Sequence, residues 1–140
     1  MQKIIIDTNV FISSLISLNY PHLILQEAIS SEKIQICISP DLIKEYYTVL
    51  RRKKFSKYPD FVSNGEFIIS EIESIASSFS PTFIPSLISD KDDNKLLALA
   101  QECKADFLIT GNTNDFTMEI FESTRILTPK EYWEKHLNSG

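Results

Sequence analysis

The chain has 140 residues, of which 43% are hydrophobic and 24% charged, and its formal net charge is −5 at pH 7. This length allows one domain with a substantial core, and the acidic balance argues against a protein that coats nucleic acid. No apolar run is long enough to span a bilayer, and Asp7 interrupts the first one too early for a signal peptide, so we expect a cytoplasmic protein. Cys37 and Cys103 stand far apart in apolar surroundings, which favours buried free thiols over a disulfide or a metal site.

The chain begins with a short β-branched run at residues 3–6, which ends at Asp7. A run without polar alternation predicts a strand buried on both faces, as in a parallel sheet. Asp7 would then lie at the carboxyl end of the strand, where open α/β sheets bind their ligands. An equally good interpretation is that Asp7 caps a helix predicted over about residues 10–18. Thr8 and Asn9 are small polar residues that can hydrogen-bond nearby backbone or fix the acid in one rotamer.

The middle of the chain continues the alternation of helices and strands. A second helix is predicted from Pro21, and a second buried strand over residues 35–38. Ser39-Pro40-Asp41 then supplies an N-cap, a proline at the first helical position and an acid in the first turn. Glu45 lies between inward-facing positions of this helix. A solvated helix residue is the commoner interpretation, and the alternative is that Glu45 points into a pocket towards Asp7.

Five of the fourteen basic residues fall between Arg51 and Lys57, directly after this helix. Cations at a helix C-terminus complement its dipole. A compatible functional interpretation is a phosphate-contacting patch made by Arg51, Arg52, Lys53 and Lys54, with Phe55 and Tyr58 available to stack on bases. Further on, apolar spacing predicts helix from residue 61 to 75, interrupted at residues 63–65, and residues 79–84 are interpreted as a short strand.

Three acids at positions 90, 92 and 93 open the next helix, which runs to Cys103. One acid suffices for capping, and three this close repel one another unless a cation compensates. A third strand over residues 105–110 leads into a glycine turn, and a last strand over residues 125–127 leads into a capping box at residues 128–131. Regular alternation of strands and helices predicts an α/β fold with a central parallel sheet flanked by helices in three layers.

Four segments together resemble the PIN domain family, and most closely its VapC-like toxins from toxin–antitoxin systems. They are IIIDTNVFISS, SPDLIKEYYTVLRRKKF, DKDDNKLLALAQECKADFLITGN and ILTPKEYW, in this order over nearly the full length. The resemblance implies a single PIN-like nuclease domain over residues 1–140. It also implies a Mg²⁺- or Mn²⁺-dependent endoribonuclease that is restrained by a small antitoxin and is homodimeric.

The resemblance also assigns roles to individual residues. It makes Asp7, Glu45 and Asp93 the catalytic and metal-binding acids, with Thr110 and Asn9 as polar residues that support them. The fourth acid of many PIN domains falls at Asn112, an amide that can ligate a metal through its carbonyl but brings no charge. Asp115 could substitute for it if the loop folds back, and Asp90 or Asp92 could do so from the other side.

The chemistry of RNA hydrolysis agrees with these residue types. Carboxylates are the ligands that Mg²⁺ prefers, and a two-metal site would hold its ions ~3.5–4 Å apart. A metal-free ribonuclease would use histidines, but neither His22 nor His136 follows a predicted strand. Two alternatives remain open: a PIN-like module that binds RNA or a partner with little cleavage because of Asn112, and a metal-dependent phosphatase. Against the phosphatase, no second acid stands two residues after Asp7.

Overall fold

The structure is a computed structural model that describes all residues except 87, 89, 114–115, 117 and 138–140. Its strands are β1 (Gln2–Ile6), β2 (Ile34–Ile38), β3 (Ser77–Ser78), β4 (Phe107–Ile109), β5 (Ile120–Phe121) and β6 (Thr124–Leu127). Its α-helices are α1 (Thr8–Ile16), α2 (Tyr20–Ser30), α3 (Pro40–Leu50), α4 (Phe61–Ile75), α5 (Lys91–Cys103) and α6 (Pro129–Tyr132). A 3-10 turn, η1 (Lys53–Phe55), follows α3, and a π-helical turn, η3 (Trp133–Leu137), follows α6.

The strands form one sheet in the order β3-β2-β1-β4-β6-β5. Neighbouring strands are parallel, except that β5 pairs antiparallel with β6. The chain builds outwards from β1 through β2 to β3, then crosses back and adds β4 on the other side of β1. Strand order therefore reverses between β1 and β4, and open α/β sheets bind ligands at such a switch point.

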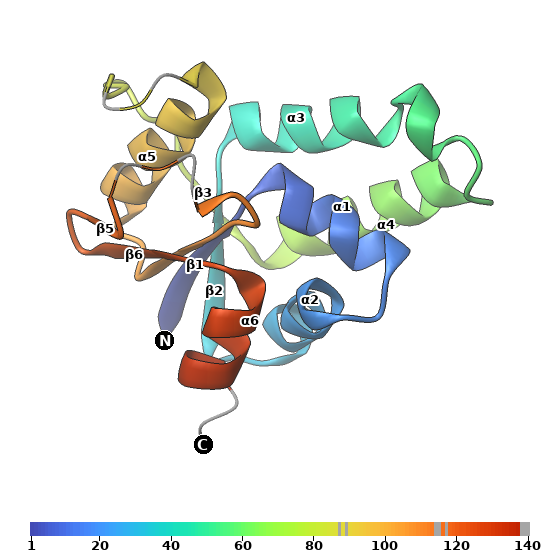
Figure 1. The fold of residues 1–140 in the computed structure, drawn as a ribbon, viewed down its shortest axis with the longest axis horizontal. Coiled ribbons are helices and arrows are strands. Elements are labelled where there is room, and N and C mark those ends of the chain that lie inside the picture. Colours follow the sequence, from blue (N-terminus) through green and yellow to red (C-terminus); the bar gives the residue numbers. More distant parts are fainter. Residues whose placement is uncertain (87, 89, 114–115, 117, 138–140) are drawn as a thin grey trace.

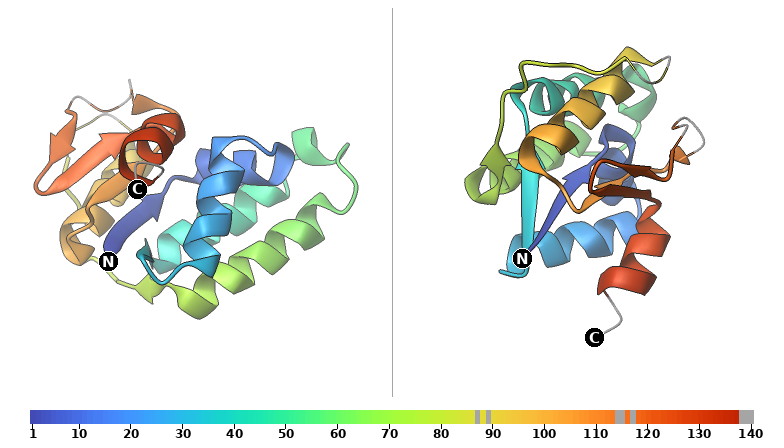
Figure 2. Two further views of the ribbon diagram at one scale, coloured as in Figure 1. Left: turned by 90° about the horizontal axis from the view of Figure 1, so that it is seen from below. Right: turned by 90° about the vertical axis from the view of Figure 1, so that its left-hand side faces the viewer.

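Helices cover both faces of this sheet, which confirms the predicted layered α/β fold (Figures 1 and 2). Helices α1, α2 and α4 lie on one side, and α5 lies on the other (Figure 1). Helix α3 leaves the upper end of β2 in Figure 1 and runs above α1, where it packs against both α1 and α4. No helix among the described residues is long and apolar enough to cross a membrane.

The buried apolar side chains form a core that joins the sheet to its helices. Ile4 and Ile5 are fully buried, as predicted for a strand covered on both faces. Helix α5 is also apolar on the side that packs against β1 and β2, with Leu97 fully buried. Cys37 and Cys103 are buried free thiols, in agreement with the prediction.

Two predictions for residues 61–84 are wrong. Helix α4 is continuous through residues 63–65, because Gly65 lets the helix pack closely on Leu50. The strand expected over residues 79–84 is instead the two-residue β3, which ends before it. Phe79 still donates its N–H to the Ile38 carbonyl at 2.9 Å, but proline at positions 81 and 85 supplies no N–H for further pairing.

The predicted helix caps are confirmed where the sequence signal is specific. The Ser39 hydroxyl accepts a hydrogen bond from the Leu42 N–H at 3.1 Å and so caps α3. Thr128 and Glu131 form the reciprocal capping box at the start of α6. These caps fix where α3 leaves β2 and where α6 leaves β6.

Candidate active site

Asp7 lies at the carboxyl end of β1, directly beside the end of β4. Its N–H bonds the Ile109 carbonyl at 3.0 Å, and the fully buried Thr110 hydroxyl donates to Asp7 Oδ2 at 2.7 Å. Asp7 occupies the N-cap position of α1, yet its side chain makes no capping hydrogen bond with the described residues of that helix. Helix capping therefore does not explain the acid. The neighbouring strand holds its carboxylate instead.

The Asp7 carboxylate is only 7% exposed, and burial raises its pKa above the ordinary value. The Thr110 hydrogen bond and the nearby N–H groups of Thr8 and Asn9 oppose this rise, while the negative charge of Asp90 adds to it. Asn9 is exposed, and its backbone N–H is the group that lowers the pKa of Asp7. An ionised carboxylate here is under-compensated by protein groups, and a bound cation would stabilise it.

Glu45, which lies on α3, approaches the end of β1 next to Asp7. The Thr8 hydroxyl donates to Glu45 Oε2 at 2.7 Å, so the residue after Asp7 fixes the second acid. Burial raises the pKa of Glu45, the Thr8 hydrogen bond lowers it, and the charges of Asp92 and Asp7 raise it again. The fold thus brings together two carboxylates from distant parts of the chain, and Glu45 is half-buried.

Tyr46 connects α3 to β1 next to these acids, and the sequence analysis did not single it out. Its hydroxyl donates to the Ile6 carbonyl, and its ring stacks on Phe11 with centroids 4.4 Å apart. Burial raises the pKa of Tyr46 well above its ordinary value, and the charges of Asp7 and Glu45 raise it further. Tyr46 therefore acts as a neutral donor that positions α3, and with it Glu45, against the end of β1.

The acids at the start of α5 have different roles. Asp90 Oδ1 accepts hydrogen bonds from the N–H groups of Asp92 at 2.8 Å and Asp93 at 3.1 Å, and so caps the helix. Asp92 lines a pocket that Glu45 also lines, while Asp93 is half-buried in the first turn. Asp90 is thus the capping residue, and Asp92 and Asp93 lie in the first turn, where acids favour the helix N-terminus. Asn94 anchors the segment before α5, because its side chain donates to the Ile88 carbonyl at 2.8 Å and accepts the N–H of Ile88 at 3.2 Å.

The turn after β4 adds Asn112 to this region. The Asn112 N–H donates to Thr110 Oγ1 at 3.1 Å, so one hydroxyl links the turn to Asp7. Asp115, the predicted alternative ligand, lies outside the described residues. Within the part of the chain that the structure describes, no three His, Cys, Asp or Glu side chains converge on one metal position. The hard oxygens of Asp7 and Glu45 still suit Mg²⁺, which proteins bind through one or two carboxylates while it keeps several waters.

A pocket of about 320 Å³ opens beside Glu45, between α3 and α5. Its floor contains the buried side chains of Leu42, Val49, Leu96 and Leu99. Its charged lining consists of the acids Asp41, Glu45 and Asp92 and the cations Lys44, Arg52 and Lys95. Lys44 and Lys95 were not singled out from the sequence, although each lies within three residues of an acid that was.

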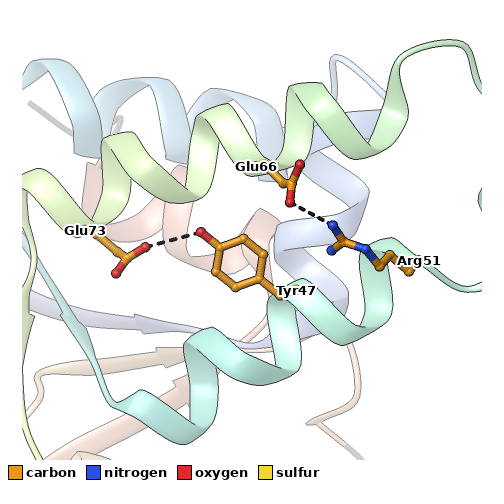
Figure 3. Close-up of polar contacts among 4 residues, drawn as sticks. All are labelled: Tyr47, Arg51, Glu66 and Glu73. Atoms are coloured by element: carbon orange, nitrogen blue, oxygen red, sulfur yellow. Dashed lines mark hydrogen bonds and ion pairs between the residues drawn. The ribbon is translucent and has the colours of Figure 1, made fainter.

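The structure separates the four cations of the predicted basic patch. Arg51 pairs with Glu66 of α4, with Nη2 and Oε2 2.9 Å apart (Figure 3). Arg52 lines the pocket, where its charge lowers the pKa of Glu45. Lys53 and Lys54 are exposed in the turn η1. The four therefore do not form one uniform surface.

The aromatic rings next to this patch have partners within the protein. Phe55 and Tyr58 both lie against Phe61, with ring centroids 5.0 Å and 5.8 Å apart. The ammonium groups of Lys54 and Lys57 lie 5.1 Å and 5.4 Å from the centroids of the Phe55 and Tyr58 rings. Their packing role is thus established by contacts, and base stacking by these rings stays a prediction.

Comparison with known proteins adds a family match over most of this framework. A family model described as PIN domain matches residues 3–114, from β1 to the turn after β4. An uncharacterized protein, MJ1680 of Methanocaldococcus jannaschii, is 32% identical over 142 aligned residues, which cover 95% of this chain and 90% of that protein. The matched range contains Asp7, Glu45, Asp93 and Thr110.

Proposed function

Because the chain belongs to the PIN domain family, whose members are generally nucleases, we propose that it is a metal-dependent endoribonuclease that hydrolyses phosphodiester bonds in RNA. The observation that carries the proposal is the pair of carboxylates at the switch point of the sheet. Thr110 holds Asp7, and Thr8 holds Glu45, at 2.7 Å each. Burial raises the pKa of both acids, and the charges of Asp90 on Asp7 and of Asp92 and Asp7 on Glu45 raise it further, which is the electrostatic condition of a site built for a cation.

In this proposal Asp7, Glu45 and Asp93 hold Mg²⁺ or Mn²⁺, and Asn112 or Asp115 completes the site. The ion, when bound, would supply an activated water and neutralise charge on the phosphate. The chain's own groups keep the acids in place: Thr110 orients Asp7, and Thr8 fixes Glu45 through Oε2 on the side of the pocket. This contact keeps the Glu45 carboxylate at the lining of the pocket.

The test is cleavage of an end-labelled RNA pool of mixed sequence in Mg²⁺, in Mn²⁺ and in chelator. Wild type is compared with Asp93→Asn and with Glu102→Gln, which neutralises an exposed acid at the other end of α5. We expect cation-dependent cutting that Asp93→Asn loses and Glu102→Gln keeps, with both variants folded by circular dichroism. Failure of folded wild type to cut with either metal contradicts the proposal.

A second candidate is a PIN-like module that binds RNA or a protein partner with little or no cleavage. Two observations favour it: the amide at Asn112, and the lack of a converging three-acid cluster among the described side chains. This candidate predicts RNA binding that survives Asp7→Asn, without cutting in wild type. In that case, gain of cutting in Asn112→Asp would identify the missing charge as the cause.

We also propose, on the sequence resemblance, that the chain is a cytoplasmic single-domain toxin that acts as a homodimer and is restrained by a small antitoxin. Induced expression of wild type should then arrest growth, and Asp7→Asn should not at equal protein level. Normal growth with active wild-type nuclease in the cell would point to a housekeeping role instead. Light scattering of the purified chain tests the dimer separately.

A further inference from the structure

We propose that the pocket between α3 and α5 binds one unpaired nucleotide of the RNA, beside the phosphodiester that is cleaved. Lys44, Arg52 and Lys95 would contact its phosphates, and the apolar floor would contact its base. The identity of this ligand rests on the proposed nuclease function. The placement of the subsite rests on the shape and charge of the pocket.

The shape of the pocket limits what it can admit. Its volume of about 320 Å³ is at the lower end of the range for small-molecule sites, roughly 300–1,000 Å³. Leu42 and Val49 from α3 and Leu96 and Leu99 from α5 line the pocket, and these apolar side chains give a flat base something to pack on. A duplex presents paired and stacked bases, so only an unstacked base can enter a space of this size.

The charges of the pocket fit a phosphate backbone that approaches Glu45. Asp92 acts on Glu45 by repulsion and Arg52 by attraction, so acids and cations face the same space. A divalent ion held by the acids would offset their negative charge. The positive charge of Lys44, Arg52 and Lys95 would then remain for the phosphates on either side of the reacting one.

The two faces of α3 have different partners, and this singles out Arg52. On one face, the ion pair of Arg51 with Glu66 and the 3.5 Å hydrogen bond from the Tyr47 hydroxyl to Glu73 join α3 to α4 (Figure 3). Arg52, the second residue after α3, lines the pocket with residues of α5. The two adjacent arginines thus differ in their contacts: Arg51 is paired with α4, whereas Arg52 contributes its charge to the proposed nucleotide site.

Binding of a fluorescein-labelled single-stranded RNA of about ten nucleotides, followed by anisotropy in Ca²⁺, which carboxylates bind in place of Mg²⁺, tests the proposal apart from cleavage. Loss of one charged contact should weaken binding roughly five- to tenfold in Lys44→Ala, Arg52→Ala and Lys95→Ala. The slope of log K against log salt should fall by about 0.7 for each. Arg51→Ala is the matched control and should stay within about twofold of wild type. The same RNA paired with its complement should bind more weakly than the single strand.

Three results overturn the proposal: no RNA binding by wild type, equal losses in Arg51→Ala and Arg52→Ala, or no loss in any of the three pocket variants. The last result in a protein that still cuts RNA would leave the nuclease function standing and remove the pocket from RNA binding. Conversely, selective losses in a protein that never cuts RNA would support the subsite while the nuclease function fails. The two proposals therefore fail separately.

Discussion

Replacing Asp7 by Asn should stabilise the metal-free protein at neutral pH. Burial raises the pKa of Asp7 above its ordinary value of 3.8, so the folded state binds this proton more tightly than the unfolded chain does. The free energy of unfolding therefore falls as the pH rises from about the ordinary pKa through the raised pKa of the folded state. Above the raised pKa the loss of stability is complete. Asn keeps the shape of the side chain and its Oδ1 can still accept the Thr110 hydrogen bond.

The magnitude follows from two opposing effects. An ionised carboxylate as buried as Asp7, at 7% exposure, carries a desolvation cost of several kcal/mol, on the order of 3. Removing this cost stabilises the variant. The neutral Asn, however, interacts more weakly with the Thr110 hydroxyl and the helix N–H groups, and this loss offsets roughly 1–2 kcal/mol of the gain. We therefore expect a net gain of about 1–2 kcal/mol, or about 3–6 °C in Tm for a chain of this size.

The assay is urea unfolding followed by circular dichroism at several pH values above 4, in chelator and with Mn²⁺. Wild type should lose stability as pH rises and regain about 2.7 kcal/mol when Mn²⁺ reaches roughly 100 times its Kd. Asp7→Asn should keep only the part of the pH response that the raised pKa of Glu45 contributes, and its stabilisation by the same Mn²⁺ concentration should fall to about half or less. Asp106→Asn is the control, because Asp106 is exposed and accepts a hydrogen bond from the Lys3 N–H at 2.9 Å. A chelated Asp7→Asn protein that is less stable than wild type at neutral pH would refute this reasoning.

Three further substitutions test the framework around the site. Thr110→Val removes the only hydroxyl that the structure gives Asp7 among the described residues, so the free energy of unfolding should fall by about 1.5–3 kcal/mol and Mn²⁺ affinity should drop in a titration. Gly65→Ala should destabilise α4 by about 1–2 kcal/mol in urea, against the usual preference for Ala in helices, because a Cβ there meets the buried Leu50 side chain. An increase in stability would show that Leu50 can move aside. Ser39→Ala should cost about 1 kcal/mol in the same assay through loss of the α3 cap, and no change would mean that solvent replaces it.

Local sequence signals predicted most of the fold because each has a direct physical cause. The unalternating run at residues 3–6 is buried on both faces, and Ser39 and Thr128 cap helices as their neighbours indicate. The local signals failed where tertiary packing determines the secondary structure. Gly65 reads as a helix break in isolation, yet it is the residue that lets α4 approach Leu50. The antiparallel β5 likewise depends on a two-residue pairing that no periodicity reveals.

The sequence indicates candidate site residues, but it does not indicate the contacts between them. Acids at strand ends and at a helix start are visible in the sequence, but the sequence leaves open which of them cap helices. The structure shows that Asp90 caps and Asp7 does not. The sequence suggests that Thr8 bonds nearby backbone or fixes Asp7 in one rotamer, whereas its hydroxyl donates to Glu45. Such contacts join residues far apart in the chain, and only the assembled sheet brings them together.

Direct measurement of Mn²⁺ binding by electron paramagnetic resonance tests the central claim, that these carboxylates gather to hold a catalytic cation. Wild type, Asp7→Asn, Glu45→Gln and the control Asp106→Asn are titrated under the same conditions without RNA. The account predicts saturable binding in wild type and in the control, weakened at least tenfold by either site substitution, since each removes a charged ligand worth about 1.4 kcal/mol or more. Equal Mn²⁺ affinity in all four proteins would contradict it.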